Sequence, residues 1–186
     1  MLESTYLPAW KAAVQQANAK GVMCSYNSLN GVPTCADPKL KKLLRETWNF
    51  TGYITSDTDA VSDMFKAHHY SKSAPEACCQ AMRDGGCDMD SGGTYWNSLL
   101  DGVSSGLCNM STVDVALTNT MRLRFELGLF DPIDKQPYWD TTKYGLASVN
   151  TPKAQADNLF MTQQARPSLI PSLCTRFTRA GIEWRR

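Results

Sequence analysis

Acidic and aromatic side chains follow or lie on three short apolar segments of this 186-residue chain. In chain order they are Tyr26-Asn27, Asp57-Thr58-Asp59, and Asp88 with Asp90. If the segments are parallel strands, carboxylates at these positions can serve as nucleophile, general base or metal ligands. An aspartate directly after a strand is also a common helix cap or turn residue. For each aspartate, therefore, a structural role competes with a catalytic one.

Several other signatures of catalytic and binding sites are missing from the sequence. It contains no P-loop and no nucleophile elbow, and its Gly85-Gly86 and Gly92-Gly93 pairs lack the spacing of a dinucleotide-binding loop. None of the cysteines forms a Cys-x-x-Cys pair. Adjacent residues rarely point at one ion, so we expect His68-His69 to be loop histidines. These patterns predict no metal site and no cofactor.

Apolar spacing and turn residues predict the elements that must position these side chains. A helix is expected over residues 6–18, strands over 22–26 and 52–56, and a turn-rich loop over 27–36. Asp37-Pro38 predicts the start of the next helix, which extends to about residue 48. Aspartate caps the first turn there, and the missing N–H of proline costs nothing at the first helical position.

Residues 73–127 continue the alternation of strands and helices. Ser73 and Glu76 form a capping box that opens a helix ending at Gly85-Gly86. A strand over 87–90 and helices over about 95–105 and 112–127 follow. The inward face of the last helix is predicted from its apolar spacing to comprise Val113, Ala116, Leu117, Thr120 and Leu127.

This order of elements is typical of an α/β fold with a parallel sheet. Three strand–helix units are visible, whereas a complete (β/α)8 barrel takes about 250 residues. The pattern therefore leaves two architectures open, a small doubly wound domain and a part of a larger barrel.

Composition and charge exclude several classes of protein. Hydrophobic residues make up 42% and aromatic residues 10% of the chain, too much for an intrinsically disordered protein. The formal net charge of +1 argues against a dedicated nucleic-acid binder. No apolar run approaches the roughly 18 residues of a membrane-spanning helix, and the first twenty residues lack the apolar region of a signal peptide. We therefore expect no nucleic-acid and no membrane partner.

The seven cysteines admit two interpretations. They are either scattered buried thiols or parts of disulfides in a secreted protein, in which case the odd number leaves one unpaired. Two glycosylation sequons, Asn49-Phe50-Thr51 and Asn109-Met110-Ser111, lean weakly towards secretion.

Beyond residue 128 the regular pattern is lost, and we expect an extended connector. Tyr138-Trp139 could stack on a sugar ring, but anchoring of the connector by burial is favoured. Residues 166–186 include five arginines, one glutamate and two prolines without a sustained period. A basic tail can contact nucleic acid or a membrane surface, but a disordered or foreign end is the favoured interpretation.

Five ordered motifs resemble glycoside hydrolase family 3, and most of all its β-xylosidases and bifunctional xylosidase/arabinofuranosidases. The resemblance is carried by VMCSYNSLNGVPTCAD over 22–37, ESTYLP over 3–8, GYITSD over 52–57, AMRDGGCDMD over 81–90 and RLRFELGLFDP over 122–132, followed by PYW at 137–139. It covers about residues 3–165.

The resemblance implies an α/β fold that is the C-terminal part of a (β/α)8 TIM-type barrel, incomplete, followed by a linker and an atypical tail. Its expected boundaries are 1–130 for the partial barrel domain, 131–165 for the interdomain linker and the start of the next domain, and 166–186 for an atypical, disordered tail. The early barrel strands precede the matched region.

The resemblance also implies roles for individual residues. Asp57 corresponds to the catalytic nucleophile of a retaining double displacement, Tyr26 lies beside the sugar at the cleavage site, and Met23 lines the same pocket. The acid/base carboxyl of the family lies in the domain after the barrel and is absent from this chain. Thr58 departs from the pattern, because glucosidase-like members have tryptophan and xylosidase-like members usually have cysteine at that position.

The function implied is therefore a fragment of an exo-acting β-D-xylosidase or α-L-arabinofuranosidase of xylan breakdown, inactive in isolation. Its substrate would be a xylo-oligosaccharide or an aryl or alkyl β-glycoside, and its parent would be extracellular or in the cell wall. In a secreted parent we expect Cys24 and Cys35, which flank the turn-rich loop, to be bridged.

Three alternatives stay open. One is a β-glucosidase-type member of the family, and another is a non-catalytic carbohydrate-binding remnant. The third is an unrelated metal-dependent hydrolase that uses Asp57, Asp59, Asp88 and Asp90.

Overall fold

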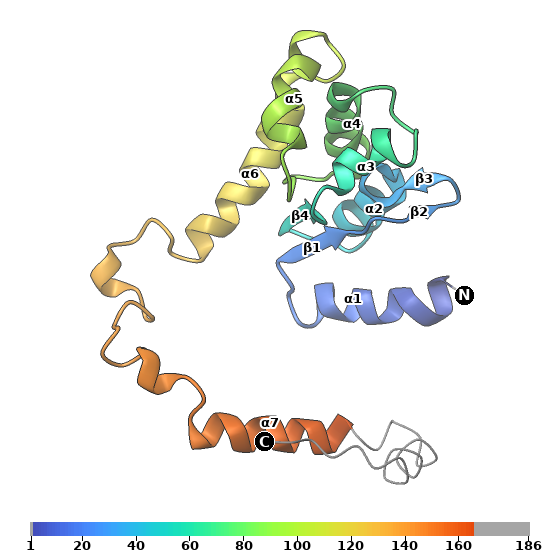
Figure 1. Cartoon of the computed structure of the whole chain (residues 1–186). Helices are drawn as coiled ribbons and strands as arrows, with labels where there is room; N and C mark the ends of the chain where they lie inside the picture. The colour runs from blue at the N-terminus through green and yellow to red at the C-terminus, as the bar shows by residue number, and fades with distance from the viewer. Residues whose placement is uncertain (1, 166–186) are drawn as a thin grey trace, which may run out of the picture. The chain divides into compact units, whose positions relative to one another are not determined.

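The computed structural model describes residues 2–165, and the tail predicted over 166–186, with Cys174, lies outside the described residues. The chain folds into two compact units, and the boundary between them follows Phe130. Seven α-helices and four strands are present in the described part: α1 Leu7–Gln15, β1 Gly21–Cys24, β2 Ser28–Leu29, β3 Val32–Pro33, α2 Pro38–Lys41, β4 Tyr53–Ser56, α3 Ala60–Lys66, α4 Ala74–Gln80, α5 Thr94–Ser104, α6 Met110–Glu126 and α7 Pro152–Ala165 (Figure 1). Three wide π-helical turns, η1 Leu2–Tyr6, η3 Lys42–Thr47 and η4 Ala81–Gly85, extend α1, α2 and α4.

A parallel pair of strands is the centre of the first unit. β1 and β4 run side by side, with Val22 opposite Ile54 and Cys24 opposite Ser56. The predicted third strand over 87–90 makes only an isolated parallel bridge, between Met89 and Thr55. The α/β class with parallel strands is as predicted, although the third segment contributes less regular pairing than its sequence indicates.

Side chains of the strands alternate between a buried face and a more exposed face. Val22, Cys24, Ile54 and Ser56 are buried, and the helical layer packs against them. The two clusters of buried residues on this side are Val14, Val22, Leu44, Trp48, Phe50 and Ile54, and Cys24, Cys35, Ala36, Ala60, Val61, Met64, Ala77, Ala81 and Cys87. Met23 and Thr55, which are register partners, lie on the other face.

Local sequence signals account for several helix ends. The Asp37 carboxylate accepts a hydrogen bond from Lys39 N at 2.9 Å, with Pro38 at the first helical position, as predicted. Ser73 Oγ accepts from Glu76 N at 3.4 Å, while the Glu76 carboxylate reaches Lys72 N rather than Ser73 N. The helix then ends through η4 at Gly86, whose φ of 71° lies in the left-handed region.

Some predicted features differ from the structure. The loop over 27–36 contains a short antiparallel pair, β2 and β3, and the helix α3 follows β4 almost immediately. α6 has only Ala116 buried, whereas Leu117 and Leu127 are 55% and 62% exposed, because the helix packs through a narrow stripe of small and polar residues.

The second unit also differs from the predicted extended connector. It contains α7 and two short 3-10 turns, Ile133–Lys135 and Leu146–Ser148. Tyr138 and Trp139 are 78% and 58% exposed, so they do not anchor this segment by burial. Tyr138 instead packs edge-to-face on Tyr144, with the ring centroids 5.2 Å apart.

Candidate functional site

The carboxyl ends of β1 and β4 bring two of the predicted site residues together. Asp57 N donates to Cys24 O at 2.9 Å, which continues the ladder of β1 and β4 by one residue. Tyr26 lies two residues beyond Cys24, and its hydroxyl is close enough to the Asp57 carboxylate for that group to raise its pKa. Met23, which is 50% exposed, lies one residue before the end of β1 on the open face of the sheet.

Electrostatics around Tyr26 keep its hydroxyl protonated. Desolvation, then the hydrogen bond to Asp57 and the negative charge of Asp57, raise the pKa of Tyr26 above its ordinary value of 10.0. A neutral phenol can donate a hydrogen bond to a carboxylate, so Tyr26 is suited to orient Asp57. The Asp57 carboxylate also accepts a hydrogen bond from the backbone of the next residue, from Thr58 N to Oδ1 at 2.7 Å.

The loop that carries Tyr26 is fastened at several points. A disulfide joins Cys24 to Cys35, with their Cα atoms 5.1 Å apart, inside the reach of such a bridge. Thr34 N donates to Asn27 O at 3.1 Å, and Thr34 Oγ1 donates to Ser25 O. The bridge and these hydrogen bonds fix the register of the loop next to β1.

His68 is a residue near this site that sequence reasoning treated only as a loop histidine. It does lie in the loop after α3, as predicted, and its Nε2 is 2.7 Å from Tyr26 O. The contact ties the end of α3 to the loop after β1. A histidine pair in a polar loop carries no spacing that could have indicated this partner.

Asp59 packs against the loop over 91–93. Its backbone lies in the left-handed region, with φ 63°, and its N–H donates to Ser91 O at 2.8 Å. A Cβ built on Gly92 would lie 2.7 Å from Asp59 Oδ1, so this carboxylate rests on the backbone of the loop over 91–93.

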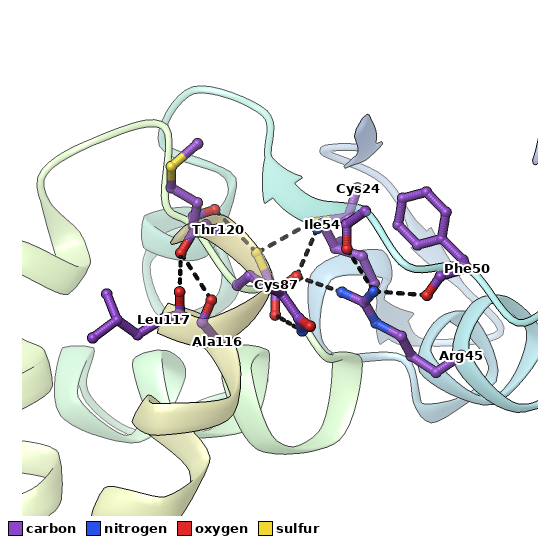
Figure 2. Close-up of polar contacts among 12 residues, drawn as sticks. Cys24, Arg45, Phe50, Ile54, Cys87, Ala116, Leu117 and Thr120 are labelled. Atoms are coloured by element: carbon purple, nitrogen blue, oxygen red, sulfur yellow. Dashed lines mark hydrogen bonds and ion pairs between the residues drawn. The ribbon is translucent and has the colours of Figure 1, made fainter. Parts of the chain in front are cut away.

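Asp88 has a structural role in the sheet. Its carboxylate accepts hydrogen bonds from Arg45 Nη2 at 2.5 Å, Ile54 N at 2.7 Å and Asn119 Nδ2 at 2.8 Å. Arg45 also donates to the carbonyl oxygens of Phe50 and Gly52 (Figure 2). Desolvation raises the pKa of Asp88 despite these partners. The network joins η3, β4, the segment over 87–90 and α6.

The Asp90 carboxylate likewise accepts hydrogen bonds with a structural role. It accepts from Ser56 Oγ at 3.0 Å and from Thr94 N and Tyr95 N at 2.8 and 3.0 Å, and so caps α5. Across residues 2–165, no group of three or more histidine, cysteine or acidic side chains could hold a metal ion. The four aspartates of the metal-dependent alternative, Asp57, Asp59, Asp88 and Asp90, therefore do not form such a group.

The remaining cysteines divide into bridged and free. Cys79 is bridged to Cys108, a pairing that the sequence did not indicate. Cys78 and Cys87 are free and buried, and desolvation raises the pKa of each thiol to about 12. Neither thiol is ionised at neutral pH, which makes both inert in thiolate chemistry. The sulfur atoms of Cys87 and Cys24 are 4.0 Å apart, and Figure 2 shows the two side chains next to each other.

Comparison with known proteins gives one family. Residues 1–123 match the family described as glycosyl hydrolase family 3 N terminal domain. A probable exo-1,4-beta-xylosidase, bxlB, from Aspergillus clavatus is 40% identical over 158 residues, which cover 83% of this chain and 20% of the fungal protein. The beta-xylosidase/alpha-L-arabinofuranosidase 1 of Medicago sativa subsp. varia is 38% identical over 156 residues, with 83% and 20% covered. The chain thus spans about a fifth of the length of these relatives.

Solved structures agree with the sequence matches. The exo-beta-xylosidase XlnD, in complex with a xylobiose aziridine activity-based probe, has a TM-score of 0.70 and 32% identity, over 75% of this chain and 18% of that one. A beta-glucosidase from Listeria innocua in complex with glucose has a TM-score of 0.72 and 27% identity, over 83% of this chain and 20% of that one.

Proposed function

Since the chain belongs to glycosyl hydrolase family 3, we propose that it is the nucleophile-bearing part of a retaining β-glycosidase of the exo-acting β-D-xylosidase or α-L-arabinofuranosidase type. The observation that carries the proposal is the pair of Asp57 and Tyr26 at adjacent carboxyl ends of parallel strands. Side chains at that end form the active site in a (β/α)8 barrel. We accordingly assign residues 1–130 to the later part of such a barrel and 131–165 to the linker and the start of the next domain.

In this mechanism an Asp57 oxygen attacks the anomeric carbon of the terminal sugar. The glycosidic C–O bond breaks, the leaving oxygen receives a proton from a second carboxyl, and a glycosyl ester forms on Asp57. Water then hydrolyses the ester from the same face, with net retention of configuration. We assign the second carboxyl to a part of the parent beyond this chain, so residues 1–186 alone should not turn over substrate.

Tyr26 supports this chemistry without exchanging its proton. Its raised pKa keeps the hydroxyl protonated, so that it can donate to Asp57 and orient the attacking carboxylate. Met23 presents an apolar surface beside the pair, on the face of the sheet that is less buried. His68 acts as a positioning residue, because it holds the backbone that carries Tyr26.

Xylo-oligosaccharides and aryl or alkyl β-glycosides are the proposed substrates of the parent. Relatives named as xylosidases, at 38–40% identity, support the pentose preference. The similarity to solved β-glucosidases favours the second candidate, a β-glucosidase-type member. A third candidate, a non-catalytic carbohydrate-binding remnant, would bind sugars without turnover.

An extracellular or cell-wall location of the parent is part of the same proposal. The Cys24–Cys35 and Cys79–Cys108 disulfides support it, because such bridges persist in oxidising compartments. No helix within residues 2–165 has the length and apolar character needed to cross a bilayer.

Covalent trapping tests the nucleophile directly. The full-length parent is incubated with an aryl 2-deoxy-2-fluoro-β-xyloside, whose fluorine slows hydrolysis of the glycosyl-enzyme, and its peptides are sequenced by mass spectrometry. We expect the label on Asp57, its loss in Asp57→Asn and its retention in Asp59→Asn. A label on another residue would refute the assignment. Sugar binding without any label or turnover would favour the non-catalytic candidate.

A further inference from the structure

One of the two sequons lies in a fully exposed segment of the described chain. Asn109, Met110 and Ser111 are all exposed, and they form the start of α6, with Asn109 as its N-cap and Met110 and Ser111 in its first turn. The start of this helix is fixed, because the preceding Cys108 is bridged to Cys79 in α4. The three residues of the acceptor motif are therefore presented to solvent from an anchored position.

The side chain of Asn109 is held by the hydroxyls that follow it in the chain. Its Oδ1 accepts hydrogen bonds from Ser111 Oγ and Thr112 Oγ1, both at 3.0 Å. No group within residues 2–165 accepts a hydrogen bond from the Asn109 amide nitrogen. The oxygen of the side chain is thus held by the hydroxyls of Ser111 and Thr112, and its nitrogen points to no acceptor of the described residues.

The other sequon is presented differently. Phe50, at its centre, is only 4% exposed and packs in the core, with the Arg45 guanidinium 5.0 Å from its ring centroid. Thr51 Oγ1 accepts from Lys20 Nζ at 3.1 Å. In the folded chain this motif cannot be drawn out for a modifying enzyme without unpacking Phe50.

The disulfides indicate where such a modification would occur. Cys24–Cys35 and Cys79–Cys108 are both formed, and disulfides of this kind are made in the secretory pathway, where asparagine-linked oligosaccharides are also attached. Exposed sequons of secreted proteins are the acceptors of such glycans.

We propose that Asn109 carries an N-linked glycan, transferred from a lipid-diphosphate-linked oligosaccharide. The amide nitrogen attacks the anomeric carbon of the first sugar, and the C–O bond to the diphosphate breaks. The lipid diphosphate leaves with the electron pair, and a base of the transferase takes one proton from the nitrogen.

The glycan would also cover apolar surface. Leu107 and Met110, beside Asn109, are 39% and 55% exposed and line a hollow of about 450 Å³. Sugars attached at Asn109 can pack against these side chains, which reduces the exposed apolar area of the loop.

Secretion from yeast tests the proposal. The 186-residue chain is expressed behind a secretion signal, and its mass and peptides are compared before and after an amidase that removes N-linked glycans and leaves aspartate. We expect an amidase-sensitive mass increase that maps to Asn109. Ser111→Ala should abolish it, whereas Ser111→Thr, which keeps the sequon hydroxyl, should retain it.

Thr112→Ala is the matched control, because it removes the second hydroxyl that contacts Asn109 Oδ1 but leaves the sequon intact. The glycan should persist in this variant. An unmodified Asn109, a mass increase that resists the amidase, or equal occupancy in Ser111→Ala and Thr112→Ala would each overturn the proposal.

Discussion

Removal of the Asp88 carboxylate should destabilise the first unit more than removal of any surface carboxylate. Asp88 is only 4% exposed at its side chain and accepts three hydrogen bonds, from Arg45, Ile54 N and Asn119. Asp88→Ala leaves the Arg45 cation without its carboxylate and a strand N–H without an acceptor. Loss of one partner from a buried ion pair costs about 3–5 kcal/mol.

The structure places the expected cost at the lower end of that range. Arg45 is 19% exposed and keeps its hydrogen bonds to Phe50 O and Gly52 O, so its charge is not left wholly uncompensated. We therefore expect Asp88→Ala to lower the free energy of unfolding by about 3 kcal/mol. Asp88→Asn should cost less, because it keeps the shape and one acceptor oxygen.

Urea unfolding followed by far-ultraviolet circular dichroism measures these differences on the whole chain. Asp84→Ala is the matched control, because Arg83 and Asp84 form an ion pair at 2.7 Å with side chains 48% and 32% exposed. Exposed pairs contribute about 0–1 kcal/mol. If Asp88→Ala costs no more than Asp84→Ala, the network around Asp88 does not hold the sheet as argued.

Three further predictions concern other parts of the molecule. In the full-length parent, Asp57→Asn should lower hydrolysis of an aryl β-xyloside by about 10⁴-fold or more, whereas Asp59→Asn should retain most of the activity. Gly85→Ala should abolish soluble folding, because its Cβ would lie 1.9 Å from Cys35 O, whereas Gly31→Ala, with φ +83° and open space, should cost about 1 kcal/mol in a urea titration. Burial raises the pKa of Asp88 in the folded chain above its ordinary value of 3.8, which applies in the unfolded chain. At a pH between these two pKa values, the Asp88 carboxyl is therefore more fully protonated in the folded than in the unfolded chain. The free energy of unfolding should therefore fall as pH rises through that window, and urea midpoints of Asp88→Asn should lack this contribution.

Local sequence signals predicted the helix ends correctly where a residue type strongly favours a capping position. Asp37-Pro38, Ser73 and Gly86 each mark a helix end that the structure contains. The helix α3 escaped prediction because it begins without a side-chain cap, directly after Asp59 in a left-handed conformation. The helix also has only seven residues, which is too short to show a clear helical period of apolar residues.

The face of α6 was mispredicted for a related reason. Apolar spacing assigns Leu117 and Leu127 to the interior, but the contacts of the helix are made by Ala116 and by Asn119, which reaches Asp88. A buried carboxylate required a polar partner, and no single-sequence pattern reveals that pairing. Tertiary context thus overrides hydrophobic periodicity at this helix.

The candidate site was predicted in part. Motif and strand order indicated that Tyr26 and Asp57 follow adjacent strands, and their proximity is a consequence of parallel pairing in register. The contact between His68 and Tyr26 O joins residues 42 positions apart and depends on the path of α3, so it could not be read from composition or spacing.

The two disulfides follow one another along the chain without interlacing, and this order bears on synthesis. Cys24 and Cys35 leave the ribosome before the other cysteines of this stretch, so their ring can close while neither Cys78 nor Cys79 has yet emerged. The second ring has no such protection, because Cys78 adjoins the correct partner of Cys108. Mispaired chains should therefore accumulate at the second bridge, and a thiol isomerase should accelerate its formation more than that of the first.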